Sequence, residues 1–180
     1  MTLPARIILA ALLGLIPSVV LAQQRAPAGS TTAVWQKKTY AEDRFEVEFS
    51  GPVKVEPTQI DAATKKKVVR STQYLQDGTS FVYIVGVQLN IDAVNFDAGA
   101  KASFNTFKCK TTLPVTELPF PGGQGREYKG SECFDGTVRT EAKYFVVGKW
   151  FYQVIALFPA DAASEQSARR FLTSFKILQP

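Results

Sequence analysis

The sequence predicts an α+β domain in which a mostly antiparallel β-sheet is flanked by two helices. Three observations support this fold class. The strand-like segments come in two groups, and each group is followed by a segment with helical spacing of its apolar residues. Asp-Gly and Gly-Lys pairs lie between consecutive strands, where antiparallel hairpins need tight turns. Two strands are apolar on both faces, so each face of the sheet requires a covering layer.

The N-terminal segment has the three regions of a cleavable secretory signal. Arg6 precedes an apolar run over residues 7–21, and small residues end the segment near Ala22. The run is about 15 residues long, shorter than the ~20 that a spanning helix needs, which favours a cleaved signal over a membrane anchor. Residues 23–33 have nothing to bury and predict a flexible leader. We expect residues 34–180 to form a single domain without a transmembrane segment, periplasmic or secreted after cleavage.

The charge balance is mildly basic. The chain has 21 basic residues, 16 acidic residues and no histidine, and removal of the signal takes away only Arg6, which leaves a net charge of +4. The basic residues are scattered and not striped, so we expect no nucleic-acid partner. The one run of three is Lys65, Lys66 and Lys67, ahead of a strand. Such runs are typically solvated, and the alternative is that the three lysines contact an anionic group of a partner.

The first group of strands begins with a strict alternation. Residues 44–50 place phenylalanine and valine on one face and glutamate on the other, as in a half-buried strand, and Gly51 ends the segment. Two further strands are expected over residues 67–75 and 80–89, with a hairpin turn at Asp77-Gly78. The strand over 80–89 is apolar on both faces and should be central.

Two segments have the apolar spacing of a helix. The first starts at Asn95 or Asp97, ends at Cys109 and carries an apolar stripe of Phe96, Ala100, Phe104 and Phe107. The second follows Asp161 as N-cap, runs to about residue 175 and carries Ala168, Phe171, Leu172 and Phe175 on one side. This spacing is what core packing demands, and stacking against a cofactor is the alternative.

A meander of three strands is expected over residues 125–158, with turns at Asp135-Gly136 and Gly148-Lys149. Its last strand is apolar on both faces and should also be interior. The loop before the meander, residues 119–125, is rich in glycine. It precedes a strand and not a helix, so it is not a phosphate-binding loop. Phe120 lies between two prolines in this loop and is a candidate contact for a partner.

The chain has two cysteines, Cys109 and Cys133, which lie 24 positions apart. Two cysteines in one small exported domain most often pair, so we expect a disulfide between the first helix and the hairpin. Such a bond stabilises the fold by about 3 to 4 kcal/mol in the chain-entropy model. The alternative is a reactive thiol, which needs a nearby base or a Cys-x-x-Cys arrangement, and the sequence offers neither.

The absence of histidine removes Ser-His-Asp and Cys-His catalysis and weakens zinc and copper sites. The acidic residues lack the spacing of a calcium loop, and Glu46 and Glu48 fit the solvated face of a strand. Glycosidase-type chemistry needs only two carboxylates, but no spacing marks two of them as partners. We therefore assign no catalytic, cofactor-binding or metal-ligating residue.

Two segments carry a resemblance. "RFEVEFSGPV" (44–53) and "YQVIALFPADAASEQSARRFLTSFKI" (152–177) resemble a pattern of uncharacterised exported bacterial proteins that are similar to the PsbP/Mog-type α/β/α sandwich family. Ser50 stands where the pattern usually has proline. The resemblance implies an antiparallel sheet covered by helices on both faces, and an accessory or partner-binding role more than an enzymatic one. It carries no site residues across.

The sequence thus predicts an exported, non-enzymatic accessory or interaction domain whose partner is an envelope protein or polymer. The first alternative is a carrier of a small apolar ligand or lipid, with a pocket between sheet and helices lined by Phe104, Phe107, Tyr83 and Trp150. The second is a histidine-independent hydrolase that uses paired carboxylates.

Overall fold

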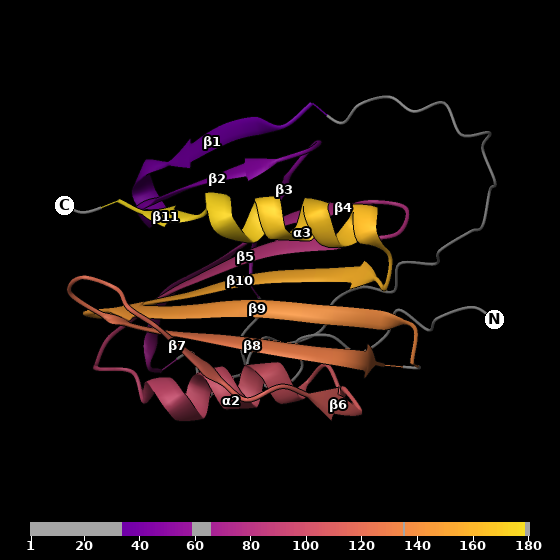
Figure 1. The fold of residues 1–180 in the computed structure, drawn as a ribbon. Coiled ribbons are helices and arrows are strands. Elements are labelled where there is room, and N and C mark those ends of the chain that lie inside the picture. Colours follow the sequence, from indigo (N-terminus) through magenta and orange to yellow (C-terminus); the bar gives the residue numbers. More distant parts are fainter. Residues whose placement is uncertain (1–33, 59–65, 135, 179–180) are drawn as a thin grey trace.

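The computed structural model describes residues 34–58, 66–134 and 136–178. The predicted signal, the predicted leader, Lys65 and Asp135 lie outside the described residues. The described part is an α+β fold with a mostly antiparallel sheet and two helices, as predicted (Figure 1).

An antiparallel sheet of eight strands forms the centre of the molecule, in the order β3-β4-β5-β10-β9-β8-β6, and β7 also pairs with β8. The strands are β3 (Lys54–Pro57), β4 (Val68–Asp77), β5 (Val82–Asn90), β6 (Thr111–Thr112), β7 (Thr116–Leu118), β8 (Gln124–Cys133), β9 (Val138–Val147) and β10 (Trp150–Pro159). The two strands that are apolar on both faces, β5 and β10, are neighbours in the middle of the sheet. The prediction that both are interior is confirmed.

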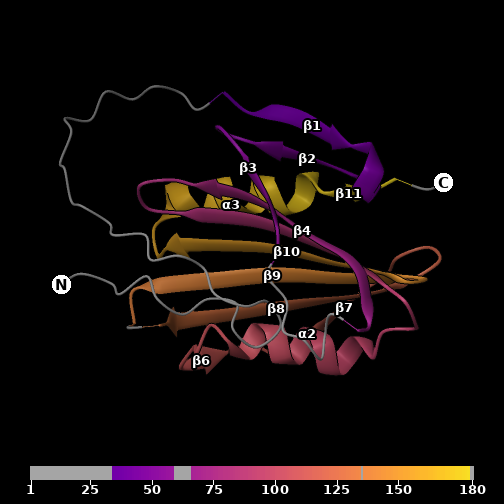
Figure 2. The same ribbon diagram turned by 180° about the vertical axis from the view of Figure 1, so that it is seen from behind.

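A second sheet of three strands lies beside α3 over one face of the first (Figures 1 and 2). Its order is β1-β2-β11, with β1 (Gln36–Tyr40), β2 (Phe45–Phe49) and β11 (Lys176–Ile177), and the short 3-10 helix η1 (Ala41–Asp43) connects β1 to β2. The half-buried strand predicted at 44–50 is therefore present, but it belongs to this second sheet. The sequence predicted a single sheet. The difference arises because β2 has only one apolar face, which packs onto the central sheet from outside.

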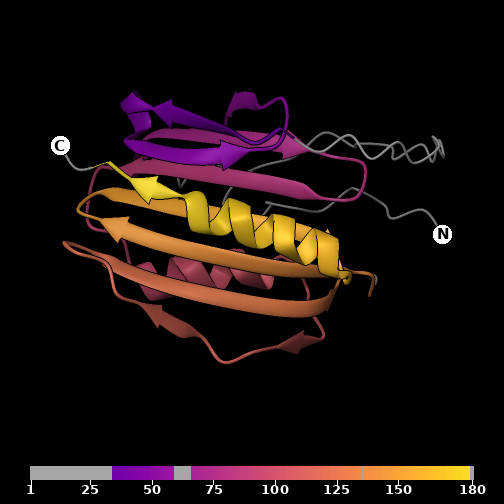
Figure 3. The ribbon, with the colours of Figure 1, turned by 45° about the horizontal axis from the view of Figure 1, so that its top comes forward.

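The two helices cover opposite faces of the central sheet (Figure 3). α2 (Phe96–Asn105) packs on β8 and β9, and α3 (Ala162–Ser174) packs on β10, β9 and β2. Asn95 Oδ1 accepts a hydrogen bond from the Ala98 amide at 3.3 Å, and Asp161 Oδ1 accepts one from the Ser164 amide at 2.9 Å, so both helices begin at a predicted cap. The layers are thus α2, the central sheet, and a third layer that α3 shares with the small sheet.

The first helix ends earlier than predicted. α2 stops at Asn105, and Lys108 has a positive φ of 48°, which turns the chain out of helical geometry before Cys109. Neither helix of the described part has the length or the hydropathy to cross a bilayer.

The core consists of two apolar layers, one on each side of the central sheet. Successive residues of β10 alternate between them: Val154 packs toward α3 and the small sheet, and Ile155 packs toward α2. The aromatic stripes predicted on the two helices are buried in these layers, apart from Phe175, which is partly buried at the edge of one of them. The aromatic residues of the two helices therefore pack in the core.

The two cysteine sulfurs lie at bonding distance, 2.06 Å, in the disulfide Cys109–Cys133. The bond connects the segment after α2 to the end of β8. Cys133 is completely buried, so this pair is placed as a structural crosslink and not as an accessible thiol.

Candidate functional site

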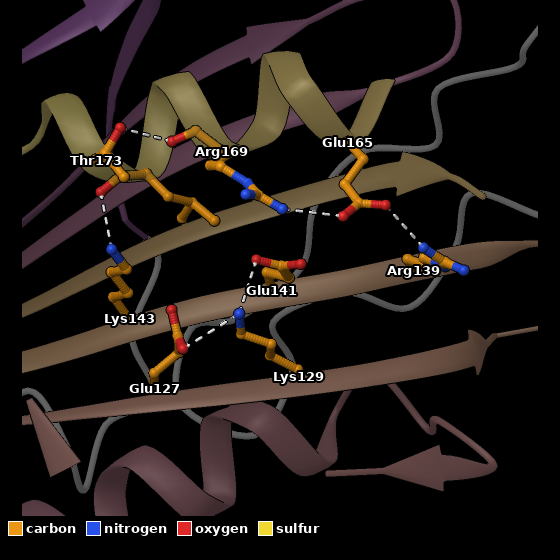
Figure 4. A network of polar contacts seen from close by, with 9 residues as sticks. Glu127, Lys129, Arg139, Glu141, Lys143, Glu165, Arg169 and Thr173 are labelled. Carbon is orange, nitrogen blue, oxygen red and sulfur yellow. Dashed lines mark hydrogen bonds and ion pairs between the residues drawn. The ribbon is translucent and has the colours of Figure 1, made fainter. Parts of the chain in front are cut away.

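A charged network on the exposed part of the central sheet is the first candidate site (Figure 4). Lys129 Nζ lies 3.2 Å from Oε2 of Glu127 on the same strand, β8, and 3.6 Å from Oε2 of Glu141, its cross-strand partner on β9. Lys143 Nζ donates to the carbonyl oxygen of Leu172 at 3.4 Å, near the end of α3. Burial is the main cause that lowers the pKa of Lys143.

This network continues along α3 as ion pairs. Arg139 and Arg169 bind opposite oxygens of Glu165 at 3.1 and 3.2 Å (Figure 4). Acidic and basic side chains alternate across the strands, an arrangement that stabilises a solvated sheet face. Lys129 lies between the two carboxylates of β8 and β9, so they do not face each other across a cavity as acid and base of a hydrolase would.

The four aromatic residues predicted to line a ligand cavity do not share one. Phe104 and Phe107 pack in the layer beneath α2, and Tyr83 packs in the layer on the opposite side of the sheet. Trp150 is the first residue of β10 and lines a different pocket. The prediction of that particular cavity is wrong, because alternate faces of the sheet separate its proposed walls.

An open pocket lies at the end of the molecule that carries β11, on the left in Figure 1. Its volume is about 220 Å³. Four segments of the chain form its wall: the residue after η1, the β7–β8 loop, the β9–β10 hairpin, and the end of β11 with the residue that follows it. The lining residues are Arg44, Phe120, Pro121, Gly122, Val147, Trp150, Tyr152, Ile177 and Leu178.

A continuous path of aromatic rings supports this pocket. Phe120 packs against Phe145 with ring centroids 5.6 Å apart, and Phe145 stacks on Phe175 at 5.7 Å. Phe175 then contacts Tyr152 at 5.9 Å, and Tyr152 stacks with Trp150 at 6.2 Å. Aromatic packing of this kind holds the pocket wall in place. The candidate contact Phe120 is thus a half-buried wall residue, not a freely exposed side chain.

The glycine-rich loop places Phe120 against this wall. The amide of Gly123 donates to the carbonyl oxygen of Phe120 at 3.3 Å, which closes a turn. A side chain at Gly123 would overlap the backbone carbonyl oxygen of Val146, so only glycine allows the loop to approach β9 this closely. The prediction that the loop is a turn-making connection is consistent with this geometry.

Arg44 is the one charged residue among those that line the pocket. Its guanidinium lies 5.4 Å from the centre of the Trp150 ring, within the range of a cation–π contact. Its backbone has φ 57° and ψ 45°, in the left-handed region, which costs a non-glycine residue about 1 kcal/mol. The Leu178 amide donates to the Arg44 carbonyl at 2.7 Å and ties it to the chain after β11.

A second arginine near Trp150 is neutralised within the fold. Arg70 lies 5.7 Å from the centre of the Trp150 ring and pairs with the carboxylate of Asp43. Asp43 is only 2% exposed and also accepts a hydrogen bond from the Tyr74 hydroxyl at 2.6 Å. Arg70 further donates to the carbonyl oxygen of Glu42 at 2.7 Å. This pair, in which Asp43 is buried and Arg70 is partly exposed, fixes η1 and therefore the position of Arg44.

By contrast, Arg44 makes no ion pair with any side chain in the part of the chain that the structure describes. Burial raises the pKa of the neighbouring Tyr152 to about 12, although the charge of Arg44 opposes this. Tyr152 is therefore neutral at physiological pH, and the described residues of the pocket wall carry a single positive charge.

The predicted lysine contacts lie elsewhere. Lys66 and Lys67 are exposed ahead of β4 and do not line the pocket, and Lys65 is outside the described residues. Among residues 34–58, 66–134 and 136–178, no group of three or more acidic or cysteine side chains is placed to hold a metal ion.

Sequence reasoning identified Phe120 and Trp150 but not Arg44, Ile177 or Leu178. The sequence predicted Arg44 as the first residue of the strand over 44–50, and its neighbours give no signal of a left-handed backbone. Ile177 and Leu178 reach the pocket only through the pairing of β11 with β2, which joins residues more than a hundred positions apart.

Comparison with known proteins supports the fold and leaves the site unassigned. No protein-family model matches the chain, and no curated protein sequence matches it either. The solution structure of cyanobacterial PsbP (CyanoP) from Synechocystis sp. PCC 6803 is similar, with a TM-score of 0.54 and 9% sequence identity, over 85% of this chain and 98% of that one. At this identity the similarity shows a PsbP-like fold alone.

Proposed function

We propose that this protein is an exported, periplasmic accessory domain without enzymatic activity, which binds a partner in the cell envelope through the pocket around Arg44 and Phe120. The observation that carries the proposal is the open pocket itself: an apolar wall, held by packed aromatic rings, with one cation that forms no ion pair with the described residues. Rigid apolar pockets of this kind receive the anchor side chains of protein partners.

The size of the pocket favours a protein contact over the transport of a ligand. Sites for small molecules typically measure roughly 300 to 1,000 Å³ and enclose most of the ligand. The present pocket is smaller, about 220 Å³, and opens to solvent. It has room for an anchor side chain of a partner. A carrier of lipids would be expected to enclose its cargo between sheet and helix, where the side chains of α2 and α3 instead form packed apolar layers.

A hydrolase with paired carboxylates receives less support. Two acidic side chains of the central sheet, Glu127 and Glu141, are bridged by Lys129. Of the acidic residues that the structure describes, none lines the pocket. The described surface therefore supports a binding role more than a hydrolytic one.

The test is affinity capture from an envelope extract with the exported protein as bait. Val147→Trp would fill the pocket from its wall, and Val69→Trp is the matched control, because Val69 is 64% exposed on β4 and does not line the pocket. We expect a specific envelope protein to be recovered by the wild type and by the control. The pocket-filling variant should recover it at least about tenfold less, the loss expected when one anchor contact is blocked.

Two results would contradict the proposal. One is equal recovery of the same proteins by the wild type and Val147→Trp. The other is turnover of a substrate by the purified wild type that a single carboxylate substitution abolishes.

A further inference from the structure

We infer that the segment of the partner that enters this pocket presents an aromatic or branched apolar side chain directly beside a carboxylate. This inference rests on the proposed function and adds the chemistry of the partner to it. The pocket wall selects the apolar group, and Arg44 selects the carboxylate.

The charge of Arg44 is the first argument. Two guanidinium groups, those of Arg44 and Arg70, lie within 6 Å of the centre of the Trp150 ring, at 5.4 and 5.7 Å. Arg70 is paired with the buried carboxylate of Asp43, whereas Arg44 has no acidic partner among the described residues. A carboxylate beside Arg44 would give this second guanidinium the same kind of partner, and arginine is well suited to bind one with two parallel hydrogen bonds.

The backbone of Arg44 is the second argument. Position 44 closes η1 with φ 57°, a conformation for which glycine is the natural residue. The arginine side chain makes a cation–π contact at this position and no ion pair with the described residues. A strained residue whose charge has no ion-pair partner among the described residues is a candidate for a binding role.

The neutral lining is the third argument. Apart from Arg44, the wall consists of aromatic, aliphatic, proline and glycine residues. The aromatic faces of Phe120 and Trp150 offer stacking surfaces to a flat apolar group. A partner with a lone carboxylate would leave this surface exposed to water, and a partner with a lone apolar side chain would leave Arg44 unpaired.

The test uses a matched pair of probes, N-acetyl-phenylalanine and its neutral amide. Each is titrated into the ¹⁵N-labelled exported protein in its disulfide-bonded form, and amide shifts of Gly122, Gly123, Val147 and Ile177 report on the pocket. We expect the acid to shift these amides and to bind about fivefold more tightly than the amide, the preference expected for one exposed charge pair. Decanoate is a third probe, which represents a lipid in place of a protein segment.

Three variants distinguish an effect of the Arg44 charge on binding from an effect on folding. Arg44→Gly suits the left-handed backbone, so its unfolding midpoint should equal or exceed that of the wild type while its preference for the acid falls to within about twofold. Arg44→Lys should retain part of the preference. Arg169→Gln removes the same charge from the exposed face of α3, where Arg169 pairs with Glu165, and should keep the full preference.

Equal affinity of the wild type for acid and amide would overturn the inference, and so would the absence of shifts at the pocket amides with either probe. Tighter binding of decanoate than of N-acetyl-phenylalanine would overturn it in favour of a lipid. Each of these results is independent of the capture experiment with Val147→Trp, so failure of the inference and failure of the proposed function remain distinguishable.

Discussion

Gly130 lacks a side chain because the disulfide passes directly over it. A Cβ atom at this position would lie 2.5 Å from Cys109 Sγ and 2.7 Å from Cys109 Cβ. Real Cβ atoms do not approach other atoms this closely, so the disulfide in this position requires glycine at residue 130. In the sequence, Gly130 is one of 12 glycines and nothing near it points to the cysteine 21 positions earlier.

Substitution of this glycine is therefore expected to destabilise the protein. Gly130→Ala should lower the free energy of unfolding by about 1 to 3 kcal/mol, the range for overpacked sites. Gly99→Ala is the matched control, because its Cβ would meet only Phe151 at an ordinary 3.9 Å within α2. The control should be neutral or stabilising by up to about 1 kcal/mol. Equal effects of the two changes in urea unfolding would contradict the close approach.

All six tyrosines have a pKa raised by burial, and the pKa values of Tyr83 and Tyr152 reach about 12. In the unfolded chain a tyrosine releases its proton near pH 10. The native state therefore holds protons that the unfolded state loses, and this stabilisation is complete below pH 10 and is lost as the pH rises toward 12.

We therefore expect the free energy of unfolding to fall between about pH 10 and pH 12. The tyrosinate absorbance of the native protein should also rise at a higher pH than that of the protein in denaturant. Coincident absorbance curves in the two states would contradict the burial of these hydroxyl groups.

The long strands and both helices were predictable from the sequence because their apolar spacing is local. Asn95 and Asp161 marked the helix starts, and the alternation around Val47 marked β2. β1 and β3 were not predictable. The sequence of β1, QKKTY, has no apolar alternation, and β3 ends at Pro57, a residue that is tolerated at a sheet edge but is usually a sign against a strand.

The disulfide acts at the scale of elements, because it fastens the segment after α2 to β8. We expect the double variant Cys109→Ala/Cys133→Ala to lose about 3 kcal/mol of stability by the chain-entropy estimate for the loop it closes. Urea unfolding of the oxidised wild type and the double variant measures the difference. A change below about 0.5 kcal/mol, typical of neutral surface substitutions, would show that the bond does not restrain the unfolded chain.

The stability of the whole molecule depends on the central sheet, because each of its faces contributes side chains to one of the two apolar layers. Val154 is fully buried on one face of β10, and Ile155 is 1% exposed on the other. We expect Val154→Ala and Ile155→Ala each to destabilise the protein by about 2 to 4 kcal/mol. Val55→Ala, on an exposed residue of β3, should change stability by less than about 0.5 kcal/mol.

Because both layers share β10, each core variant should still unfold in one transition, with coincident tryptophan fluorescence and circular dichroism. Separate transitions for the two variants would show that the layers fold independently.

The pocket is also a property of the whole molecule, which explains why the sequence predicted only part of it. Phe120 was a candidate because it lies between two prolines in a loop, and Trp150 was one of the aromatic residues expected to line a ligand pocket. Their convergence with Arg44 and Leu178 depends on how β11 and η1 close one end of the fold, and no local spacing encodes that closure.

The most direct test of the binding role is site-specific photo-crosslinking in the envelope, with a benzophenone amino acid in place of Phe120. The same residue in place of Leu113, which is 57% exposed between β6 and β7, serves as the control position. If the partner binds in the pocket, we expect a discrete crosslinked partner at position 120 and none at position 113. The adduct at position 120 should be lost when Val147→Trp fills the pocket. Adducts of equal yield at both positions, or an adduct at position 120 that survives the filled pocket, would contradict this binding role.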